Sequence, residues 1–410
     1  MRLKSSSIYY ALFMSLIISL FLGGMILFSS VSKQFSSQLA LEDRLIQNAQ
    51  SGVQYGLANA NEMNFNSPVE LDLFSEQIDS VSITKTKWGA YAVISSEAHA
   101  KKKSYSKTAL AGQINEANDP NLYVVDYGRP ISLSGETRIE GKCLAPESGF
   151  KRAYIEGKNY QGDMMVYGSL SSSEKSLPSV TENFSDDLLN FSGLIEKWDN
   201  QDSIDISFAE QGKHFIDDNF VSLRNVYLKG QMVLEVKDSI FVSKDSQLDQ
   251  VILKSKVIYI ESGFVGSAQF FASERIVLED EVVLKYPSVL GLMEGETPIE
   301  KQNKIEIGKR SRVLGTVFAL SDNPNFRLPI QIDISKESQI VGLVYCQGKT
   351  QLKGTVNGSL YTQKFYLETA SSKYENHLLD AQILDDLPEN FVYASLFQST
   401  NPLTQLQWLD

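Results

Sequence analysis

Apolar residues recur with a constant spacing of 18 through the middle of the chain. Three consecutive blocks of equal length begin at Asp238, Lys256 and Glu274. Two positions are apolar in every block: Ile240, Ile258 and Ile276, and Val242, Ile260 and Leu278. Alternating apolar positions without a helical period indicate short β-strands whose inward side chains stack from one repeat to the next.

A related pattern extends the repeat. It consists of two apolar residues with one residue between them, then five residues of any kind, then an apolar residue and a glycine that again have one residue between them. Its copies are Ile131/Leu133/Ile139/Gly141, Ile305/Ile307/Val313/Gly315, Ile332/Ile334/Ile340/Gly342 and the shorter Leu352/Val356/Gly358. We therefore predict a mainly β protein with a right-handed parallel β-helix of about 18 residues per coil over residues 126–370, each coil stacked on the next. The alternative is a series of ordinary antiparallel hairpins, in which apolar alternation and glycine turns are also common.

The repeat weakens in the middle and at the end. Residues 186–198 have helical apolar spacing and predict a helical excursion from the coils near residues 183–200. Residues 371–410 lose the repeat and predict a C-terminal cap over the open edges of the last coil. Cys143 and Cys346 each follow a template glycine by an even number of residues, so we expect interior, unbonded thiols several coils apart.

Two insertions, at residues 286–302 and 321–329, interrupt the repeat at a similar phase. We expect them to leave the coils on the same side, where a rigid scaffold would present them to a partner. The candidate partner surface mixes polar and apolar side chains: Met293, Glu294, Glu296, Asp322, Asn323, Asn325, Phe326 and Arg327. The alternative is that both are tolerated insertions without a role.

An uncharged stretch of 21 residues runs from Ile8 to Phe28. As a helix it would span roughly the 30 Å of a bilayer's hydrocarbon core. Arg2 and Lys4 precede it, so the positive-inside tendency predicts an inner-membrane anchor with a cytoplasmic N-terminus and a periplasmic or cell-surface body. The alternative is secretion after cleavage of a signal peptide, because residues 30–32 form a small-x-small site.

Helical apolar spacing continues beyond the membrane span and predicts one transmembrane and stem helix over residues 1–60. The candidate assembly residues of this stem are Phe35, Leu39, Leu45, Ile46, Val53 and Leu57. Residues 61–125 follow as a small α+β or hairpin region, because residues 81–88 and 90–96 alternate on either side of Gly89. We expect this antiparallel sheet to pack on the stem, with Trp88 as a packing residue.

An apolar span that continues as an amphipathic stem and leads into a small sheet resembles the stem of type IV pilins and pseudopilins. The resemblance covers residues 1–60. Residues 5–8 lack the leader-cleavage site of that family, and no glutamate interrupts the span. The layout is closer to that of atypical minor pilus proteins without a processed leader. The resemblance implies a structural component of a pilus-like or secretion-system assembly, with other pilin-like or envelope proteins as partners and membrane lipid around residues 8–28.

Charge and composition restrict the other possible ligands. The net charge is −12 and no basic stripe is present, so we do not expect nucleic acid as a partner. Two cysteines and three widely separated histidines offer no metal-ligand spacing. We therefore expect neither a metal site nor a cofactor.

Two other functions fit the repeat. Coils stacked end to end would make a surface scaffold or adhesin, as in short polymerising β-helices of the bactofilin type, which resemble the repeat period. A polysaccharide-active enzyme would bind glycan along one groove. However, Glu279, Asp280 and Glu281 fall on one turn and no aspartate recurs across the coils, so we expect no catalytic residues, with glycan as a possible partner only.

Overall fold

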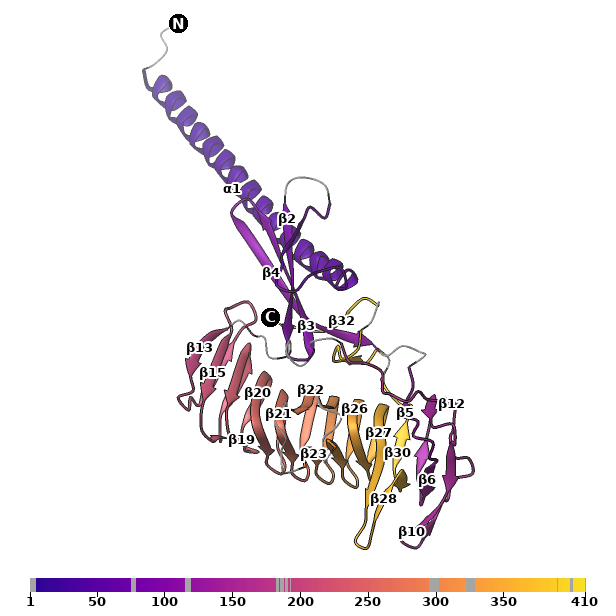
Figure 1. Ribbon diagram of the computed structural model, residues 1–410. Coiled ribbons are helices and arrows are strands. Elements are labelled where there is room, and N and C mark those ends of the chain that lie inside the picture. The colour runs from indigo at the N-terminus through magenta and orange to yellow at the C-terminus, as the bar shows by residue number, and fades with distance from the viewer. Residues whose placement is uncertain are drawn as a thin grey trace.

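The computed structural model describes residues 5–74, 79–114, 119–181, 184, 188, 191, 193–294, 302–321, 329–388, 390–398 and 401–409. It confirms the expected mainly β fold: one long N-terminal helix, a small antiparallel sheet, and closed parallel β-structure that we call the solenoid (Figure 1). Figure 1 shows the solenoid lying across the lower end of the stem, with the stem helix projecting away from it.

The stem is one unbroken helix, α1 (Ser5–Ala58). Its C-terminal half buries one face, on which Leu45, Ala49, Val53 and Leu57 follow one another at four-residue spacing. The helix ends where Asn59 donates hydrogen bonds from both its backbone and its side-chain nitrogen to the Tyr55 carbonyl, at 3.0 and 2.9 Å. This end agrees with the sequence prediction to within two residues.

An antiparallel sheet covers the buried face of α1, and we call it the stem sheet. Its strand order is β1-β2-β3-β4-β31, and β32 also pairs with β4. The bounds are β1 Val69–Leu71, β2 Ser80–Trp88, β3 Tyr91–Ala100, β4 Lys103–Ile114, β31 Val392–Tyr393 and β32 Thr404–Trp408. The helix lies close to the sheet because Gly52 has no side chain: a Cβ there would stand 2.1 Å from Ser96 Oγ.

Parallel strand pairs in the solenoid form three rows, one for each face. Six long strands bend around corners and contribute to more than one row: β20 Gln247–Ile260, β21 Val265–Leu278, β22 Val283–Glu294, β24 Arg312–Ser321, β26 Gln339–Leu352 and β27 Thr355–Glu368.

The short strands complete the rows. On the first face they are β5 Leu122–Val124, β8 Cys143–Ala145, β12 Leu170–Ser172, β13 Leu194–Lys197, β15 Lys213–Asp217 and β18 Met232–Val236. On the second face they are β6 Ile131–Ser134, β9 Phe150–Arg152, β16 Val221–Leu223, β19 Ser239–Val242, β23 Lys304–Ile307, β25 Gln331–Ile334 and β29 His377–Leu379. On the third they are β7 Arg138–Ile139, β14 Ser203–Ile206, β17 Tyr227–Gly230 and β30 Gln382–Leu384. Three short strands pair antiparallel outside these rows: β10 Tyr154–Ile155 with β11 Lys158–Asn159, and β28 Lys373–Glu375 with β27.

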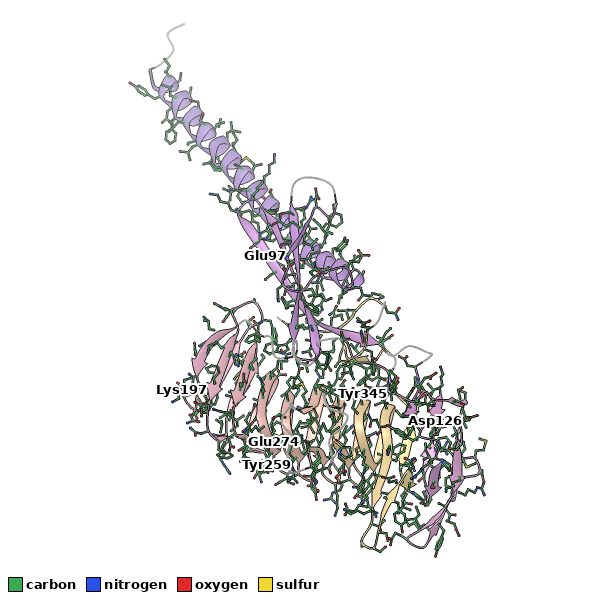
Figure 2. The ribbon with its side chains drawn as sticks, in the orientation of Figure 1. Glu97, Asp126, Lys197, Tyr259, Glu274 and Tyr345 are labelled. Atoms are coloured by element: carbon green, nitrogen blue, oxygen red, sulfur yellow. The ribbon has the colours of Figure 1, made fainter. Side chains whose placement is uncertain are left out.

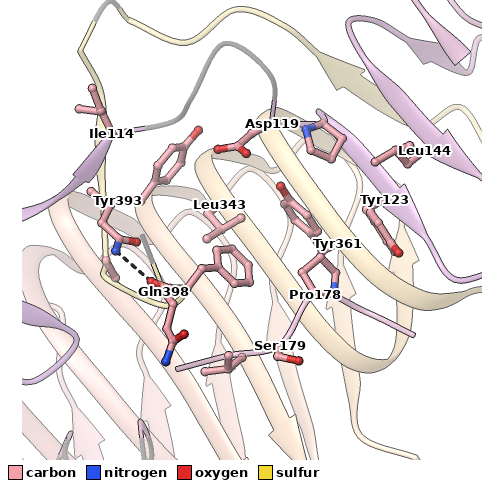
Figure 3. A pocket seen from close by; sticks show the side chains of 15 residues that line it. Ile114, Asp119, Tyr123, Leu144, Pro178, Ser179, Leu343, Tyr361, Tyr393 and Gln398 are labelled. Atoms are coloured by element: carbon pink, nitrogen blue, oxygen red, sulfur yellow. Dashed lines mark hydrogen bonds between the residues drawn. The ribbon is translucent and has the colours of Figure 1, made fainter. Parts of the chain in front are cut away.

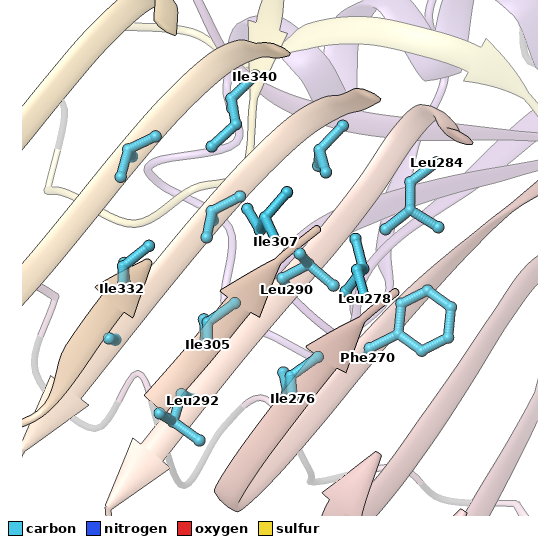
Figure 4. Packing of buried hydrophobic residues seen from close by; sticks show 14 of the residues in the cluster. Phe270, Ile276, Leu278, Leu284, Leu290, Leu292, Ile305, Ile307, Ile332 and Ile340 are labelled. Carbon is cyan, nitrogen blue, oxygen red and sulfur yellow. The ribbon is translucent and has the colours of Figure 1, made fainter. Parts of the chain in front are cut away.

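The register inferred from the repeat is confirmed. Ile240, Ile258, Ile276, Ile305 and Ile332 pair in succession across neighbouring strands. Their side chains are fully buried in one continuous core. Figure 4 shows Ile276, Ile305 and Ile332 of this series. The longer sequence intervals therefore add residues between strands without shifting the apolar positions out of line.

Three template glycines also stack, as Gly315, Gly342 and Gly358 pair in register. Their φ angles are +143°, +136° and +125°, which non-glycine residues rarely adopt. A Cβ at Gly342 would lie 1.9 Å from the Gly315 carbonyl oxygen. The glycines thus allow consecutive coils to approach each other at one corner.

The coils do not stack in chain order, in contrast to the prediction. Strand β5, near residue 122, pairs with β27 on one side and with β8 on the other. Strand β30, near residue 383, likewise pairs with β27 and with β7. One coil is therefore composite: β5 forms its first face, and β29 and β30 form the other two. From β12 the chain crosses to the opposite end of the solenoid, where β13 starts the coils that wind back to β27 (Figure 1).

This path corrects two predictions about the ends of the coils. Residues 371–410 do not cap the solenoid. Strands β29 and β30 lie between other coils, and β31 and β32 join the stem sheet. The excursion predicted near residues 183–200 is shorter: the described Phe184 and Leu188 are helical, but Leu194–Lys197 is strand β13 in parallel pairing with β15. The other residues from 182 to 192, apart from Phe191, lie outside the described residues.

Both thiols are interior and unbonded, and they lie three coils apart, as predicted. Cys346 lies on β26, and β27 and β5 separate it from Cys143 on β8. Burial raises the pKa of each thiol to about 12. At neutral pH both therefore stay protonated and behave as small apolar side chains.

The first face of the solenoid points toward the stem sheet, and we call it the stem-side face. Its outward row contains Phe271, Phe318, Tyr345 and Tyr361, all buried. The stem sheet covers this row together with the described residues of the crossing segment (residues 173–193) and of the C-terminal segment (residues 388–398), and they form a second apolar core with it. By contrast, the outward Tyr259 on the second face is exposed; Figure 2 shows it on the far side from Tyr345.

A buried amide fastens the stem sheet to the solenoid. Gln269 on β21 donates from Nε2 to the Trp88 carbonyl at 2.8 Å and accepts from the Ala90 backbone N–H at 2.8 Å. Both bonds hold the tip of the β2–β3 hairpin. The Trp88 ring is itself buried, and its Nε1 donates to the Gln250 carbonyl at 2.9 Å. Trp88 is therefore a packing residue between the two parts of the protein.

Candidate functional site

The N-terminal half of α1 presents a continuous apolar surface. Residues 7–58 form a helix long and apolar enough, by length and composition, to cross a membrane. From residue 7 to residue 40 all but one of the side chains are exposed, so the described part of the chain leaves this surface bare. Such a surface is stable only in lipid or against another apolar surface.

The structure divides the predicted stem residues into two groups. Phe35 and Leu39 are 61% and 45% exposed. Leu45, Val53 and Leu57 are buried against the stem sheet, and Ile46 is half-buried. The prediction that all six residues face a partner is therefore wrong for the second half of the helix, because the protein's own sheet occupies that face.

Polar contacts hold the stem against the sheet at the end of the bare surface. The Arg44 guanidinium forms an ion pair with Asp79, whose side chain is almost completely buried. Two residues earlier in the helix, Glu42 accepts a hydrogen bond from Lys103 of β4. These contacts fix the point at which α1 leaves the sheet, and hence the direction of its exposed half.

The insertions predicted to form a partner surface leave the solenoid from neighbouring coils. The strands before them pair in register, Met293 with Leu320 and Glu294 with Ser321. The strands after them also pair, Lys304 with Gln331. Met293 packs against the second apolar core. Glu296, Asp322, Asn323, Asn325, Phe326 and Arg327 lie outside the described residues, so the partner surface stays a prediction.

A cavity of about 430 Å³ lies where the stem sheet and the C-terminal segment meet the stem-side face (Figure 3). Its wall includes Tyr123, Tyr361, Tyr393, Phe397 and Asp119. The sequence analysis did not single out these residues. One signal was present, because Tyr345 and Tyr361 occupy equivalent outward positions in adjacent coils, and paired outward aromatics indicate a face that something covers.

Comparisons with known proteins give little further guidance. No protein-family model and no curated protein sequence matches the chain. Among solved structures, the chain is similar to the competence-associated pilin ComZ from Thermus thermophilus, with 7% identity and a TM-score of 0.23, over 91% of this chain and 95% of that chain. At this TM-score the likeness is weak.

Proposed function

We propose that this chain is a non-catalytic, membrane-anchored envelope protein that assembles through its stem helix into a pilus-like or secretion-system structure. In this proposal residues 8–28 span the inner membrane with the N-terminus in the cytoplasm, and the solenoid is held on the other side. The main support for this proposal is the structure of α1. The N-terminal half of this single helix exposes an apolar surface, whereas its C-terminal half packs against the protein's own stem sheet.

Lipid alone does not account for all of the bare surface. Residues 8–28 are sufficient to cross the hydrocarbon core. Val31, Phe35 and Leu39 lie beyond them at four-residue spacing and are 63%, 61% and 45% exposed. Side chains at this spacing share one face of a helix, here over roughly 12 Å. A stripe of this kind beside the membrane is suited to packing against the stem of another subunit.

The firm connection between stem and solenoid supports a role in display. The Gln269 hydrogen bonds and the apolar core around Trp88 and Phe318 join the two parts by direct contacts. A subunit held by its stem would therefore present the solenoid in a defined orientation.

Site-specific photocrosslinking in the native membrane tests this proposal. A photoreactive residue at Phe35 or Leu39 should capture discrete pilin-like or envelope proteins. The same residue at Ser37, which is exposed on the opposite face of the helix, is the matched control. Leu39→Asp should abolish co-purification with the captured partners and leave the fold intact, since Leu39 contacts no core.

Three outcomes would contradict the proposal: equal capture from Ser37 and Leu39, assembly unchanged in Leu39→Asp, or a mature N-terminus near Lys33. Leu45 is unsuitable for this test. It is buried under the stem sheet, so a charge there would cost several kcal/mol of stability and confuse misfolding with lost assembly.

A further inference from the structure

The two terminal coils of the solenoid have outer strand edges that are unpaired among the described residues. At one end β13 pairs only with β15 and β14 only with β17, and at the other end β12 pairs only with β8 and β9 only with β6. Figure 1 shows β13 and β12 at opposite ends of the solenoid, both beyond the stem sheet. A strand that is paired on one side leaves the N–H and C=O groups of its other edge free to bind a further strand.

Each outer strand also exposes a position that is interior elsewhere in the solenoid. Leu170 of β12 pairs with the buried Cys143. Leu194 of β13 lies in one column with the buried Met232, two strands further in. Leu170 is nevertheless 50% exposed and Leu194 48%, because no coil follows them. Inward leucines of this kind are stabilised when another coil stacks on them.

The two outer strands match each other in direction and register. Both lie on the first face, and every strand pair between them along that face is parallel. A second copy moved along the solenoid axis therefore sets its β13 beside β12 of the first copy, running in the same direction. Aligning the two inward leucines, Leu170 and Leu194, also brings Ser171 beside Ile195 and continues the interior column across the contact.

The terminal coil at the β13 end is acidic. Glu196 and Asp205 pair with lysines of the next coil, at 3.0 and 3.8 Å. Asp199 and Asp202 are exposed and form no ion pair among the described residues. Both belong to the segment that connects β13 on the first face with β14 on the third, so they lie on the side of the second face.

The β12 end presents basic side chains on that same side. Lys151 and Arg152 belong to β9, the outer strand of the second face, and both are exposed. Arg152 donates to two backbone carbonyls, and Lys151 forms no ion pair in the described part of the chain. Opposite charges thus face each other when the β12 end of one copy meets the β13 end of the next, whereas two β13 ends would repel each other.

We propose that solenoids of this protein bind one another head to tail, with β12 of one copy pairing in parallel with β13 of the next. The contact joins two different surfaces, so it does not close on itself and produces a row of subunits. A shift along the solenoid axis leaves every stem pointing the same way, so all subunits of a row can be anchored in one membrane (Figure 1). Anchoring also raises the local concentration, which favours a contact made by strands of three and four residues.

Disulfide trapping of the full-length protein in a maltoside detergent tests the proposal. The double variant Ser171→Cys, Ile195→Cys places cysteines at Cα partners of the proposed strand pair, a separation that a disulfide can bridge. With oxidised glutathione and about 200 µM protein, we expect a ladder of disulfide-linked dimers, trimers and larger species. The native Cys143 and Cys346 are buried and should not react.

The two single variants are the matched controls, and they also determine which ends meet. Ser171→Cys alone and Ile195→Cys alone should stay monomeric, and an equimolar mixture of them should give heterodimers only. Homodimers of either single variant, in amounts equal to the heterodimer, would mean that like ends meet. This result would overturn the proposal, as would a double variant that forms no ladder.

A charge exchange tests the same contact by sedimentation velocity, without added cysteines. Asp199→Lys and Lys151→Glu should each weaken the association about threefold, and the two substitutions together should restore it. Lys102→Glu, exposed on the turn between β3 and β4 of the stem sheet, is the control and should have no effect. Circular dichroism confirms that each variant is folded. Unchanged association in all variants, or additive losses in the double variant, would overturn the proposal.

All of these measurements are made in the Leu39→Asp background, which removes the proposed stem contact. Head-to-tail association should persist there, because the solenoid ends and the bare half of α1 share no residue. Photocrosslinking at Leu39 and disulfides at residues 171 and 195 report on different surfaces. A failure of stem assembly is therefore distinguishable from a failure of end pairing.

Discussion

Three polar side chains on neighbouring strands of the stem-side face show how a single residue links the coils. Glu235 on β18 lies 3.0 Å from His214 on β15 and 2.7 Å from Lys254 on β20. The hydrogen bond to His214 is the largest cause that lowers the pKa of Glu235 to about 2, and Lys254 adds to it against the opposing effect of burial. Each carboxylate oxygen thus joins β18 to a different neighbouring strand.

This lowered pKa predicts a loss of stability in acid. An unfolded glutamate has a pKa of about 4.3, so the unfolded chain takes up the proton first as the pH falls. The stabilisation is complete above about pH 4.3 and disappears between there and about pH 2. Because the Glu235 side chain is 33% exposed, we expect Glu235→Gln to cost on the order of 1 kcal/mol at pH 7.

Urea denaturation of the full-length protein in detergent at pH 7, 4 and 2.5 measures this effect. The difference between wild type and Glu235→Gln should shrink as the pH falls. Asp218→Asn is the control, since Asp218 and Lys237 form an exposed pair and should change stability by less than about 0.5 kcal/mol. A difference that stays constant across this pH range would refute the role given to the carboxylate.

At the scale of single elements, the same coil corner recurs in β24, β26 and β27. Each places a glycine where its φ is strongly positive and the preceding strand's backbone is in contact. The stem helix uses glycine for a related purpose, because a Cβ at Gly56 would lie 2.7 Å from Ile94 Cγ2. At the coil corner the missing side chain lets two backbones approach each other, and in the stem it lets the helix backbone lie directly on side chains of the sheet.

The glycine corner predicts a position-dependent cost of adding one methyl group. Gly342→Ala places a Cβ 1.9 Å from a carbonyl oxygen and should destabilise the solenoid by about 3 kcal/mol or more. Gly263→Ala is the matched control, with a φ of +81° but open space around its Cβ, and should cost only about 1 kcal/mol. Thermal unfolding of both variants gives the comparison. Equal losses would mean that conformation, rather than close approach, requires glycine at the corner.

The composite coil determines the architecture of the whole molecule. Residues 122–124 complete a coil whose other two faces come from residues 377–384. The chain therefore enters the solenoid beside the place where it leaves it. Both passages lie next to the stem sheet, and this explains how β31 and β32 return to pair with β4. The N- and C-terminal portions of the chain thereby hold stem and solenoid together.

An engineered crosslink tests this order of coils. Arg138 on β7 and Gln382 on β30 are Cα partners in parallel strands, a separation that a disulfide can bridge. In the double variant Arg138→Cys, Gln382→Cys we expect an oxidised peptide joining the two segments. The control is Arg138→Cys alone, in which the buried Cys143 and Cys346 should not react. A sequential stack of coils would place residues 138 and 382 far apart and yield no such peptide.

Several features could be predicted from the sequence because they depend on spacing along the chain. The 18-residue repeat set the apolar register of Ile240, Ile258 and Ile276, since an inward position must meet another inward position on the next coil. The uninterrupted apolar and amphipathic period set the length of α1. The positions of Trp88 and the two thiols followed from the same reasoning.

Only the tertiary structure decided which distant segments meet. A repeat defines what each coil contributes but not the order of coils, because every parallel strand edge offers similar hydrogen bonds to any other. Such long-range contacts determine the composite coil and the pairing of β32, within residues 371–410, with the stem sheet. They also determine that Leu39 is exposed on the stem whereas Leu45 is buried. The junction cavity is the clearest case, since Asp119, Tyr361 and Tyr393 come together only when the chain closes on itself.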